Sequence, residues 1–486
     1  MKQTIIVVIL VLCMNCAASA FQFTITEEAQ LHASDASALN EFGSSVAIDP
    51  VEGNTIVVGS PKKSFSRGAA YIFERSGSTW SQSAKLTASD SAANDFLGVS
   101  VDIYGDVVVV GAFNDSAGAG SVYVYEKPMG GWSDMTETAK MVASDQAGGD
   151  FLGERVSLWG DVCVAGARRD DRTANDMGAA YVFVRPVSGW TSGTETAKLT
   201  ASDAAGDDEF GSDVSIHEDI IGIGAFLEDG PLFNRGAAYL FVKPESGWES
   251  GTETAKLTAS DAADGDTFAG IGGLRGDFVV IGANRDDESF IDQGSAYVFE
   301  RPVGGWVDMT ETAKLTASDA SHTDFFGSSA VLIGNGLIIA AYNHGNSGPD
   351  IFDGSGSLYL YVRPDDGWQT STETTSFNAA DTQMEDLFGF DIDATGDTLV
   401  VGSRFDSDSF LRQGAAYVFT ICPCLGNVNL DDRVDARDVQ WFVDCLLEPG
   451  SGCACADLVL PTDIGSEDVA PFVAKLLNDR GCTPMR

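Results

Sequence analysis

The sequence predicts an all-β fold, a seven-bladed β-propeller, on three observations. Residues 254–261 (TAKLTASD) return in seven exact or altered copies whose starts lie 55 to 62 residues apart, which indicates a repeat array. Each repeat contains four segments with the residue patterns of short strands. The last repeat lacks its fourth segment, and an unmatched segment, residues 23–33, precedes the first repeat. These two segments are therefore expected to close the ring.

The first two strands of each repeat follow the Ala-Ser-Asp turn. Residues 42–48 (FGSSVAI) and 210–216 (FGSDVSI) alternate apolar and polar side chains, as a half-buried strand does. The next segment is continuously apolar and ends in two small residues, for example 107–112 (VVVVGA), which indicates a strand buried on both faces.

The third and fourth strands are separated by a turn. The third strand is typified by residues 178–183 (GAAYVF), whose glycine and alanines suit close backbone packing. A Pro- and Gly-containing turn such as 185–190 (RPVSGW) then leads to the fourth strand, which ends in the TAKLTASD motif. If residues 23–33 pair with residues 414–419, the third strand of the last repeat, two sheet edges that would otherwise be open are covered.

Two short elements recur at fixed places in the repeats. Phe-Gly or Phe-Leu-Gly stands at residues 42–43, 96–98, 151–153, 210–211, 326–327 and 388–389. Gly-Ala stands at residues 111–112, 166–167, 224–225 and 282–283, and Gly-Ser-Pro at 59–61. With these elements the chain resembles the FG-GAP repeats of integrin α-chain propellers and their bacterial relatives, over roughly residues 22–420. The resemblance implies a propeller fold and, by analogy with integrins, cell adhesion.

The N-terminus has the features of a secretory signal peptide at residues 1–20. Lys2 is positively charged, residues 4–12 are apolar, and Ala-Ser-Ala at 18–20 is a cleavage site. No later segment is long and apolar enough to predict a membrane span. We therefore expect an exported protein, secreted or extracellular or at the cell surface, whose propeller occupies residues 21–421.

The chain is strongly acidic, with a formal net charge of −43 at pH 7. Such a surface repels phosphate backbones and anionic lipids, so we expect no nucleic-acid binding. High acidity is also typical of disordered chains, but 44% hydrophobic residues in periodic segments argue against disorder here.

Residues 422–486 differ in composition and are predicted to form a separate cysteine-rich module. Six of the cysteines fall here, and an even number in a small exported module predicts disulfides, with fifteen possible pairings. The cysteines are Cys422, Cys424, Cys445, Cys453, Cys455 and Cys482. Two Cys-x-Cys pairs leave zinc as an alternative, which an oxidising compartment disfavours.

This module contains a predicted calcium loop at residues 427–438. Oxygen-bearing side chains stand at loop positions 1, 3, 5, 9 and 12, which is the ligand spacing of calcium loops, and position 7 completes the set. The predicted ligands are Asn427, Asn429, Asp431, Arg433, Asp435 and Asp438. An apolar helix face follows, and a second loop bounded by Asp457 and Asp468 leads to a helix with the same spacing. A solvated acidic turn is the alternative interpretation for both loops.

The duplicated loop and helix resemble a dockerin, the calcium-binding module that docks onto cohesins. The resemblance implies bound Ca2+ and a cohesin-like protein partner, which would contact Ala436, Arg437, Ser466 and Glu467. Asp432 stands where dockerin loops usually have glycine, and Val459 and Pro461 stand where the second loop should ligate. We therefore predict one functional calcium site and one degenerate site.

Further candidate residues repeat from blade to blade. The acids after the Gly-Ala-like pair lack the alternation of an integrin calcium loop and are predicted to cap turns, as are the aspartates before Phe-Gly. The first set is Asp115, Asp170, Glu228, Asp286 and Asp406, and the second is Asp95, Asp150, Asp208, Asp324 and Asp386. A tryptophan that begins each fourth strand is predicted to pack neighbouring blades rather than to stack on sugars. These are Trp80, Trp132, Trp190, Trp248, Trp306 and Trp368.

Histidines and the remaining cysteine give no catalytic pattern. His32, His217, His322 and His344 fall at unrelated places in the repeats, whereas catalysis needs groups that converge at one place. His344 replaces the loop acid of the sixth repeat. Cys163, in an apolar strand, is predicted to be an inert core thiol.

The sequence thus predicts an exported, non-catalytic binding or display propeller with a calcium-dependent docking module. An adhesin that binds a cell-surface ligand remains open. So does a carbohydrate-active enzyme, such as a glycoside hydrolase, or a sugar-binding lectin carried by the dockerin-like module. The enzyme would need two carboxylates that converge at one mouth of the central channel.

Overall fold

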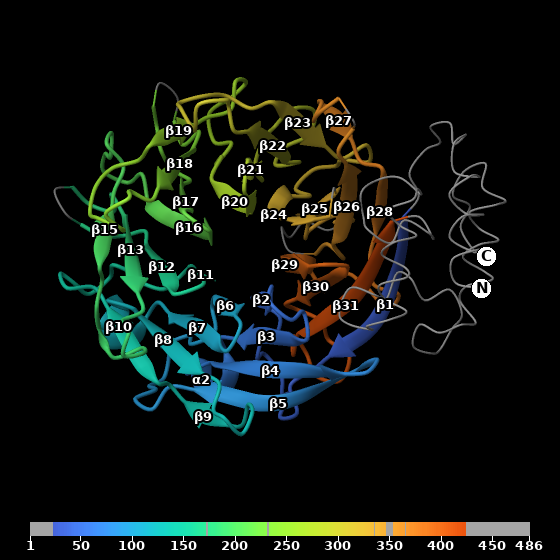
Figure 1. Ribbon diagram of the computed structural model, residues 1–486. Helices are drawn as coiled ribbons and strands as arrows, with labels where there is room; N and C mark the ends of the chain where they lie inside the picture. Colours follow the sequence, from blue (N-terminus) through green and yellow to red (C-terminus); the bar gives the residue numbers. More distant parts are fainter. Residues whose placement is uncertain are drawn as a thin grey trace, which may run out of the picture.

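The computed structural model describes residues 23–171, 174–230, 233–334, 336–346, 353–364 and 366–423. They form seven antiparallel sheets, the blades, arranged in a ring around a central channel (Figure 1). The predicted signal peptide and nearly all of the predicted C-terminal module lie outside the described residues. Within the described ranges, no helix is long and apolar enough to cross a membrane.

The first four blades are each built on four antiparallel strands, which follow one another from the inner to the outer edge of the sheet. Blade 1 contains β2 (Val46–Ile48), β3 (Thr55–Ser60), β4 (Ala69–Ser76) and β5 (Thr79–Thr87). Blade 2 contains β6 (Val101–Tyr104), β7 (Val107–Ala112), β8 (Ser121–Glu126) and β10 (Ala139–Val142). Blade 3 contains β11 (Val156–Trp159), β12 (Val162–Ala167), β13 (Ala179–Val184) and β15 (Ala197–Leu199). Blade 4 contains β16 (Phe210–His217), β17 (Ile220–Ala225), β18 (Ala237–Val242) and β19 (Ala255–Leu257).

The remaining blades complete the ring. Blade 5 contains β20 (Gly270–Arg275), β21 (Phe278–Ala283), β22 (Ser295–Glu300) and β23 (Ala313–Thr316). Blade 6 contains β24 (Phe326–Ile333), β25 (Gly336–Ala341), β26 (Ser357–Val362) and β28 (Thr375–Phe377). Blade 7 contains β29 (Phe388–Thr395), β30 (Thr398–Ser403), β31 (Ala415–Pro423) and β1 (Phe23–Leu31). Two helical turns, α2 (Lys63–Ser66) and α3 (Asp115–Gly118), lie between the second and third strands of blades 1 and 2.

The predicted closure is confirmed. β1 pairs antiparallel with β31, so that Glu27 lies opposite Phe419 and Leu31 opposite Ala416 (Figure 1). The first strand of the propeller is therefore the outer strand of its last blade. Ring closure leaves neither of these two edges open for pairing with another chain.

Three short strands were not predicted. β9 (Met135–Thr136), β14 (Gly193–Thr194) and β27 (Ser371–Thr372) pair in parallel with the outer strand of the preceding blade. The segments after Trp132, Trp190 and Trp368 thus extend one blade before the chain enters the fourth strand of the next. The prediction that the tryptophans begin the fourth strands is correct only for Trp80, which lies in β5.

The hydrophobic core lies between the blades. Each buried cluster draws side chains from two adjacent blades, as where Val57 and Ile72 of blade 1 pack with Val108 and Tyr125 of blade 2. The backbones approach so closely here that a Cβ on Gly111 would lie 1.9 Å from the carbonyl oxygen of Gly153. The Gly-Ala element of one blade therefore requires glycine because it lies against the Phe-Leu-Gly element of the next.

We expect Leu31→Ala to destabilise the ring at its closure. Leu31 is 4% exposed in a cluster that joins blades 7 and 1, and such truncations cost about 2–5 kcal/mol of unfolding free energy. Thr26→Ala, on the same strand but exposed, is the matched control and should cost little. Urea denaturation measures both, and equal effects would contradict a closure that depends on β1.

Candidate functional site

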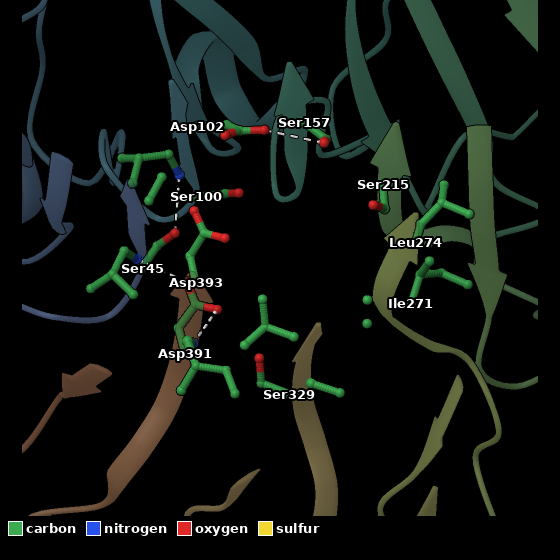
Figure 2. A pocket seen from close by; sticks show the side chains of 18 of the residues that line it. Ser45, Ser100, Asp102, Ser157, Ser215, Ile271, Leu274, Ser329, Asp391 and Asp393 are labelled. Atoms are coloured by element: carbon green, nitrogen blue, oxygen red, sulfur yellow. Dashed lines mark hydrogen bonds between the residues drawn. The ribbon is translucent and has the colours of Figure 1, made fainter. Parts of the chain in front are cut away.

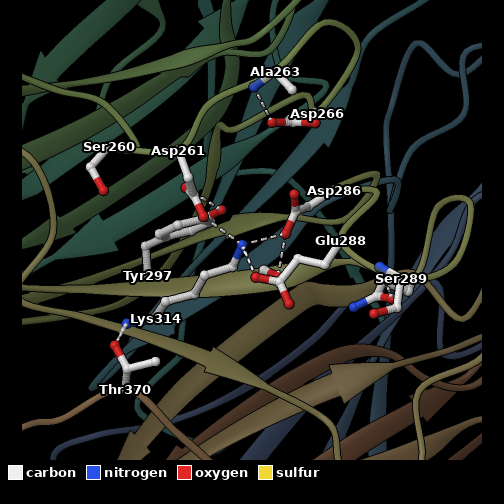
Figure 3. Close-up of polar contacts among 12 residues, drawn as sticks. Ser260, Asp261, Ala263, Asp266, Asp286, Glu288, Ser289, Tyr297, Lys314 and Thr370 are labelled. Atoms are coloured by element: carbon white, nitrogen blue, oxygen red, sulfur yellow. Dashed lines mark hydrogen bonds and ion pairs between the residues drawn. The ribbon is translucent and has the colours of Figure 1, made fainter.

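The aspartate of the TAKLTASD motif binds to the next blade. Asp261, at the end of the blade 4 outer strand, accepts hydrogen bonds from Tyr297 Oη at 3.0 Å and from Lys314 Nζ at 2.7 Å (Figure 3). Lys314 Nζ also lies 2.8 Å from Asp286 Oδ2 and 2.6 Å from Glu288 Oε1. Burial alone would lower the pKa of Lys314, but these carboxylates more than offset burial and raise it. The ammonium therefore stays charged over the whole physiological pH range.

The same contact, which we call the Asp–Tyr–Lys clasp, recurs at four other junctions. Each consists of an aspartate from one blade and a tyrosine and a lysine from the next, with hydrogen bonds of 2.6–3.0 Å. The sets are Asp35–Tyr71–Lys85, Asp90–Tyr123–Lys140, Asp145–Tyr181–Lys198 and Asp203–Tyr239–Lys256.

Four of the five loop acids have a different role from the one predicted. Asp406 caps its loop by accepting a hydrogen bond from the Asp408 amide, as expected. The other four instead pair with the clasp lysine of their own blade at 2.7–2.8 Å. These four are Asp115, Asp170, Glu228 and Asp286. The partner lysine lies 25 to 28 residues further along the chain, so a local pattern could not reveal it.

The aspartates before Phe-Gly are turn residues, as predicted. Asp266, in the equivalent position of blade 5, accepts a hydrogen bond from the Ala263 amide at 2.6 Å (Figure 3). In the other blades the backbone amide three residues earlier donates the same hydrogen bond to Asp95, Asp150, Asp208, Asp324 and Asp386. Burial raises the pKa of Asp266 to about 6 and that of Asp386 to about 7.

A second contact, the Ser–Glu clasp, also joins successive blades. Ser260 donates from its backbone amide and its hydroxyl to the two oxygens of Glu311 at 2.9 and 2.6 Å. Equivalent hydrogen bonds join other successive blades. Between blades 6 and 7 the glutamate comes from β1, because the Ala380 amide donates to Glu27 Oε2 at 3.0 Å. The serine and aspartate of TAKLTASD are thus both structural contacts.

The tryptophans pack between blades, as predicted. All six are 4–8% exposed, and each belongs to a buried cluster shared by two neighbouring blades. Cys163 is fully buried, which raises the pKa of its thiol and agrees with an inert core residue.

The histidines lie apart from one another. His217 packs against Trp159 with tilted rings and 4.2 Å between the ring centroids, and His322 Nδ1 accepts a hydrogen bond from the Ile291 amide at 3.0 Å. His32 lies 3.6 Å from Asp408, and His344 lies between two carboxylates of the loop that joins blades 5 and 6, Asp319 and Asp324. Among the described residues, these contacts do not bring two histidines to one place.

The predicted calcium ligands cannot be placed. Asn427, Asn429, Asp431, Arg433, Asp435, Asp438, Asp457 and Asp468 lie outside the described residues. In the part of the chain that is described, no group of three or more His, Cys, Asp or Glu side chains could hold a metal ion.

The central channel contains a cavity of about 410 Å3 that is lined by the inner strands of all seven blades. Serine is the most frequent of its polar side chains, but aspartates replace serine at several places. Figure 2 shows Asp102 on β6 and Asp391 and Asp393 on β29 among these serines. Asp213 on β16 also lines the cavity, 3.6 Å from Arg155 Nε. These carboxylates were not predicted, although aspartate in a serine position of the repeat was a usable signal.

These carboxylates join the inner strands of successive blades. Asp393 Oδ2 accepts from the Ile48 amide at 2.8 Å, across the junction between blades 7 and 1. Ser157 makes the equivalent contact elsewhere, since its Oγ accepts from the Ile216 amide at 3.2 Å. The other Asp393 oxygen accepts from the Ala394 amide at 2.8 Å. Both oxygens therefore already have partners within the fold.

Burial changes the acidity of the channel carboxylates. It raises the pKa of Asp102 to about 7 and that of Asp393 to about 8, and the negative charge of Asp102 raises the pKa of Asp393 further. Such groups hold protons near neutral pH and could donate them to a ligand in the channel.

We expect Lys314→Met to destabilise the propeller by about 3 kcal/mol, because it leaves the buried Asp286 carboxylate without its cation. The control is Lys243→Met. Its partner Asp219 has a side chain that is 69% exposed, so this change should cost less than about 1 kcal/mol. Chemical denaturation compares the two variants, and similar losses would contradict a stabilising role for the clasp.

We expect Asp393→Ser to raise stability at pH 8 and to flatten its pH dependence. Asp393 keeps its proton up to about pH 8 in the folded protein, whereas an unfolded chain releases it near pH 4. Deprotonation therefore opposes folding as the pH rises from about 4 to about 8. Serine keeps an acceptor for Ile48, and urea midpoints at pH 5 and pH 8 measure the effect. Asp161→Ser, at a side chain that is 67% exposed, should leave the pH profile unchanged.

The comparison with protein families agrees with this architecture. The FG-GAP repeat family matches residues 25–73, 80–125, 135–183, 194–241, 252–299, 309–361 and 371–419. No curated protein matches the sequence. Among solved structures, the WD40 β-propeller domain of Doa1 is similar, with a TM-score of 0.48 and 11% identity over 82% of this chain and 97% of that chain. Because the seven family matches cover more than half of its length, the chain belongs to the FG-GAP repeat family.

Proposed function

We propose that this protein is an exported, non-catalytic interaction scaffold. Its propeller would present a surface for a protein or cell-surface ligand, and residues 422–486 would dock a second protein in a calcium-dependent manner. The observation that carries the proposal is the use of the repeated polar side chains. One blade is joined to the next by the repeated aspartate, lysine, tyrosine and glutamate. Side chains that differ from blade to blade are therefore left to the exposed loops.

The loops between second and third strands offer a binding surface on one face of the ring. Their tips contact the next blade through backbone carbonyls and expose apolar side chains at the same place in four blades. These side chains, which we call the apolar rim, are Phe65, Phe233, Ile291 and Leu411, and they are 60–89% exposed. Large apolar side chains at matching positions are typical of protein-binding surfaces.

The docking half of the proposal depends on the predicted calcium loop. Neutralising its carboxylates with Ca2+ would order the loop and fix the two predicted helices, so that an apolar face becomes available to a partner. The ion would act structurally and would not take part in a reaction.

A carbohydrate-active enzyme or lectin is the second candidate, because the channel brings carboxylates together. A general acid needs a raised pKa, which Asp102 and Asp393 have. The oxygens of Asp393 already accept backbone amides at 2.8 Å, as a structural role requires. This contact favours the scaffold over the enzyme.

We expect the full chain to bind Ca2+ and, in its presence, to bind immobilised cohesin domains. Asp431→Asn combined with Asp435→Asn removes two of the predicted acidic ligands and should abolish both activities, which calorimetry and surface plasmon resonance measure. Asp457→Asn, in the degenerate loop, is the control and should leave binding unchanged.

Calcium binding that survives the double substitution would overturn the docking assignment. A panel of polysaccharides and a glycan array test the alternative with the same protein. Hydrolysis that is lost in Asp393→Ser would identify an enzyme and contradict the scaffold, whereas the scaffold predicts no hydrolysis.

A further inference from the structure

The junction between blades 5 and 6 departs from the Asp–Tyr–Lys clasp at two places at once. In blade 5, Lys314 lies opposite Tyr297 across the third and fourth strands. In blade 6, the residue opposite Tyr359 is Ser376, so the lysine is missing. The loop acid of this blade is also missing, because His344 stands in its place. Both partners of the usual ion pair have therefore been replaced together.

The imidazole of His344 takes the place of the missing ammonium. Its Nδ1 lies 3.1 Å from Asp324 Oδ2, and its Nε2 lies 3.9 Å from Asp319 Oδ2. Asp319 lies in the turn after the outer strand of blade 5, and its other oxygen accepts a hydrogen bond from Tyr359 Oη at 2.9 Å. The ring of His344 meets that of Tyr359 edge to face at 6.0 Å. One histidine thus faces two carboxylates from the loop that joins the two blades.

We propose that His344 makes the junction between blades 5 and 6 sensitive to pH, tight when the imidazole is protonated and weaker when it is neutral. A protonated imidazole can donate from both nitrogens, to Asp324 and toward Asp319. A neutral one has a single proton, and its other nitrogen then turns a lone pair toward a carboxylate. The five junctions with a clasp lysine have no imidazole in this place.

The surroundings determine the direction of the effect. The hydrogen bond to Asp324 raises the pKa of His344 above 6.5, against the opposing effect of burial, and the charges of Asp324 and Asp319 raise it further. The other groups at this junction are Tyr359, whose pKa is raised by burial, so that it stays neutral, and Glu373, which binds Ser318. The stabilisation is thus complete below about pH 6.5 and is lost as the pH rises through the raised pKa of the folded state.

Hydrogen–deuterium exchange of the full chain between pH 6 and pH 9 tests this proposal, after correction for the intrinsic effect of pH on exchange. We expect protection at residues 319–326 and 357–362 to fall several-fold as the pH rises. The equivalent residues at the junction between blades 4 and 5, 261–268 and 295–300, serve as an internal control, because Lys314 stays charged. The two junctions are compared from pH 7 upward, where the Asp266 carboxyl of the control, with a pKa of about 6, is already ionised. Equal pH dependence at the two junctions would overturn the proposal.

A double substitution provides the second test. His344→Asp combined with Ser376→Lys restores the residues of the other blades and should remove the pH dependence at residues 319–326. NMR titration of the wild-type histidines, with His344→Gln to assign the signal, should give a pKa above 6.5. A value at or below 6.5, or a pH dependence that persists in the double variant, would contradict the proposal.

Discussion

The contact between the end of each outer strand and the next blade is the constraint on which the rest of the ring depends. It requires every blade to have an outer strand, and blade 7 obtains one only because β1 returns to pair with β31. β1 also brings Asp35 to Tyr71 and Lys85 of blade 1, and Glu27 to the amide of Ala380. One strand therefore completes the sheet, the Asp–Tyr–Lys clasp and the Ser–Glu clasp at the closure.

Periodicity was sufficient to predict the fold because each strand has a distinct pattern of apolar residues. The strand order, the closure by residues 23–33 and the packing of the tryptophans followed from these patterns, since burial is what an apolar pattern reports. Lys314 shows which contacts periodicity does not predict, namely ion pairs between residues far apart in the sequence. Its partners Asp261 and Asp286 lie 53 and 28 residues away in sequence, and no local pattern states which acid faces which base.

The channel carboxylates were missed for a related reason. An alternating strand predicts that Asp102 and Asp393 face away from the apolar side, but it does not distinguish solvent from a narrow channel. The difference is large in energy, because only the channel removes water from the carboxylate and raises its pKa. The predicted calcium ligands, from Asn427 to Asp468, lie outside the described residues, so that part of the candidate site remains a prediction.

Departures from the repeat are therefore more informative about function than the repeat itself. A residue that recurs in every blade, such as the clasp tyrosine, is explained by the junction that it makes. Asp393 in a serine position, or His344 in an acid position, has no such explanation, because serine or aspartate satisfies the same place elsewhere in the ring. Each substitution puts a titratable group with a raised pKa where Ser157 or a loop acid stands in another blade, and Asp102 does the same in blade 2. Proteins depart from their own local rules chiefly at functional or strained sites, which makes the channel and the junction of blades 5 and 6 the places in this ring where a test for function is most informative.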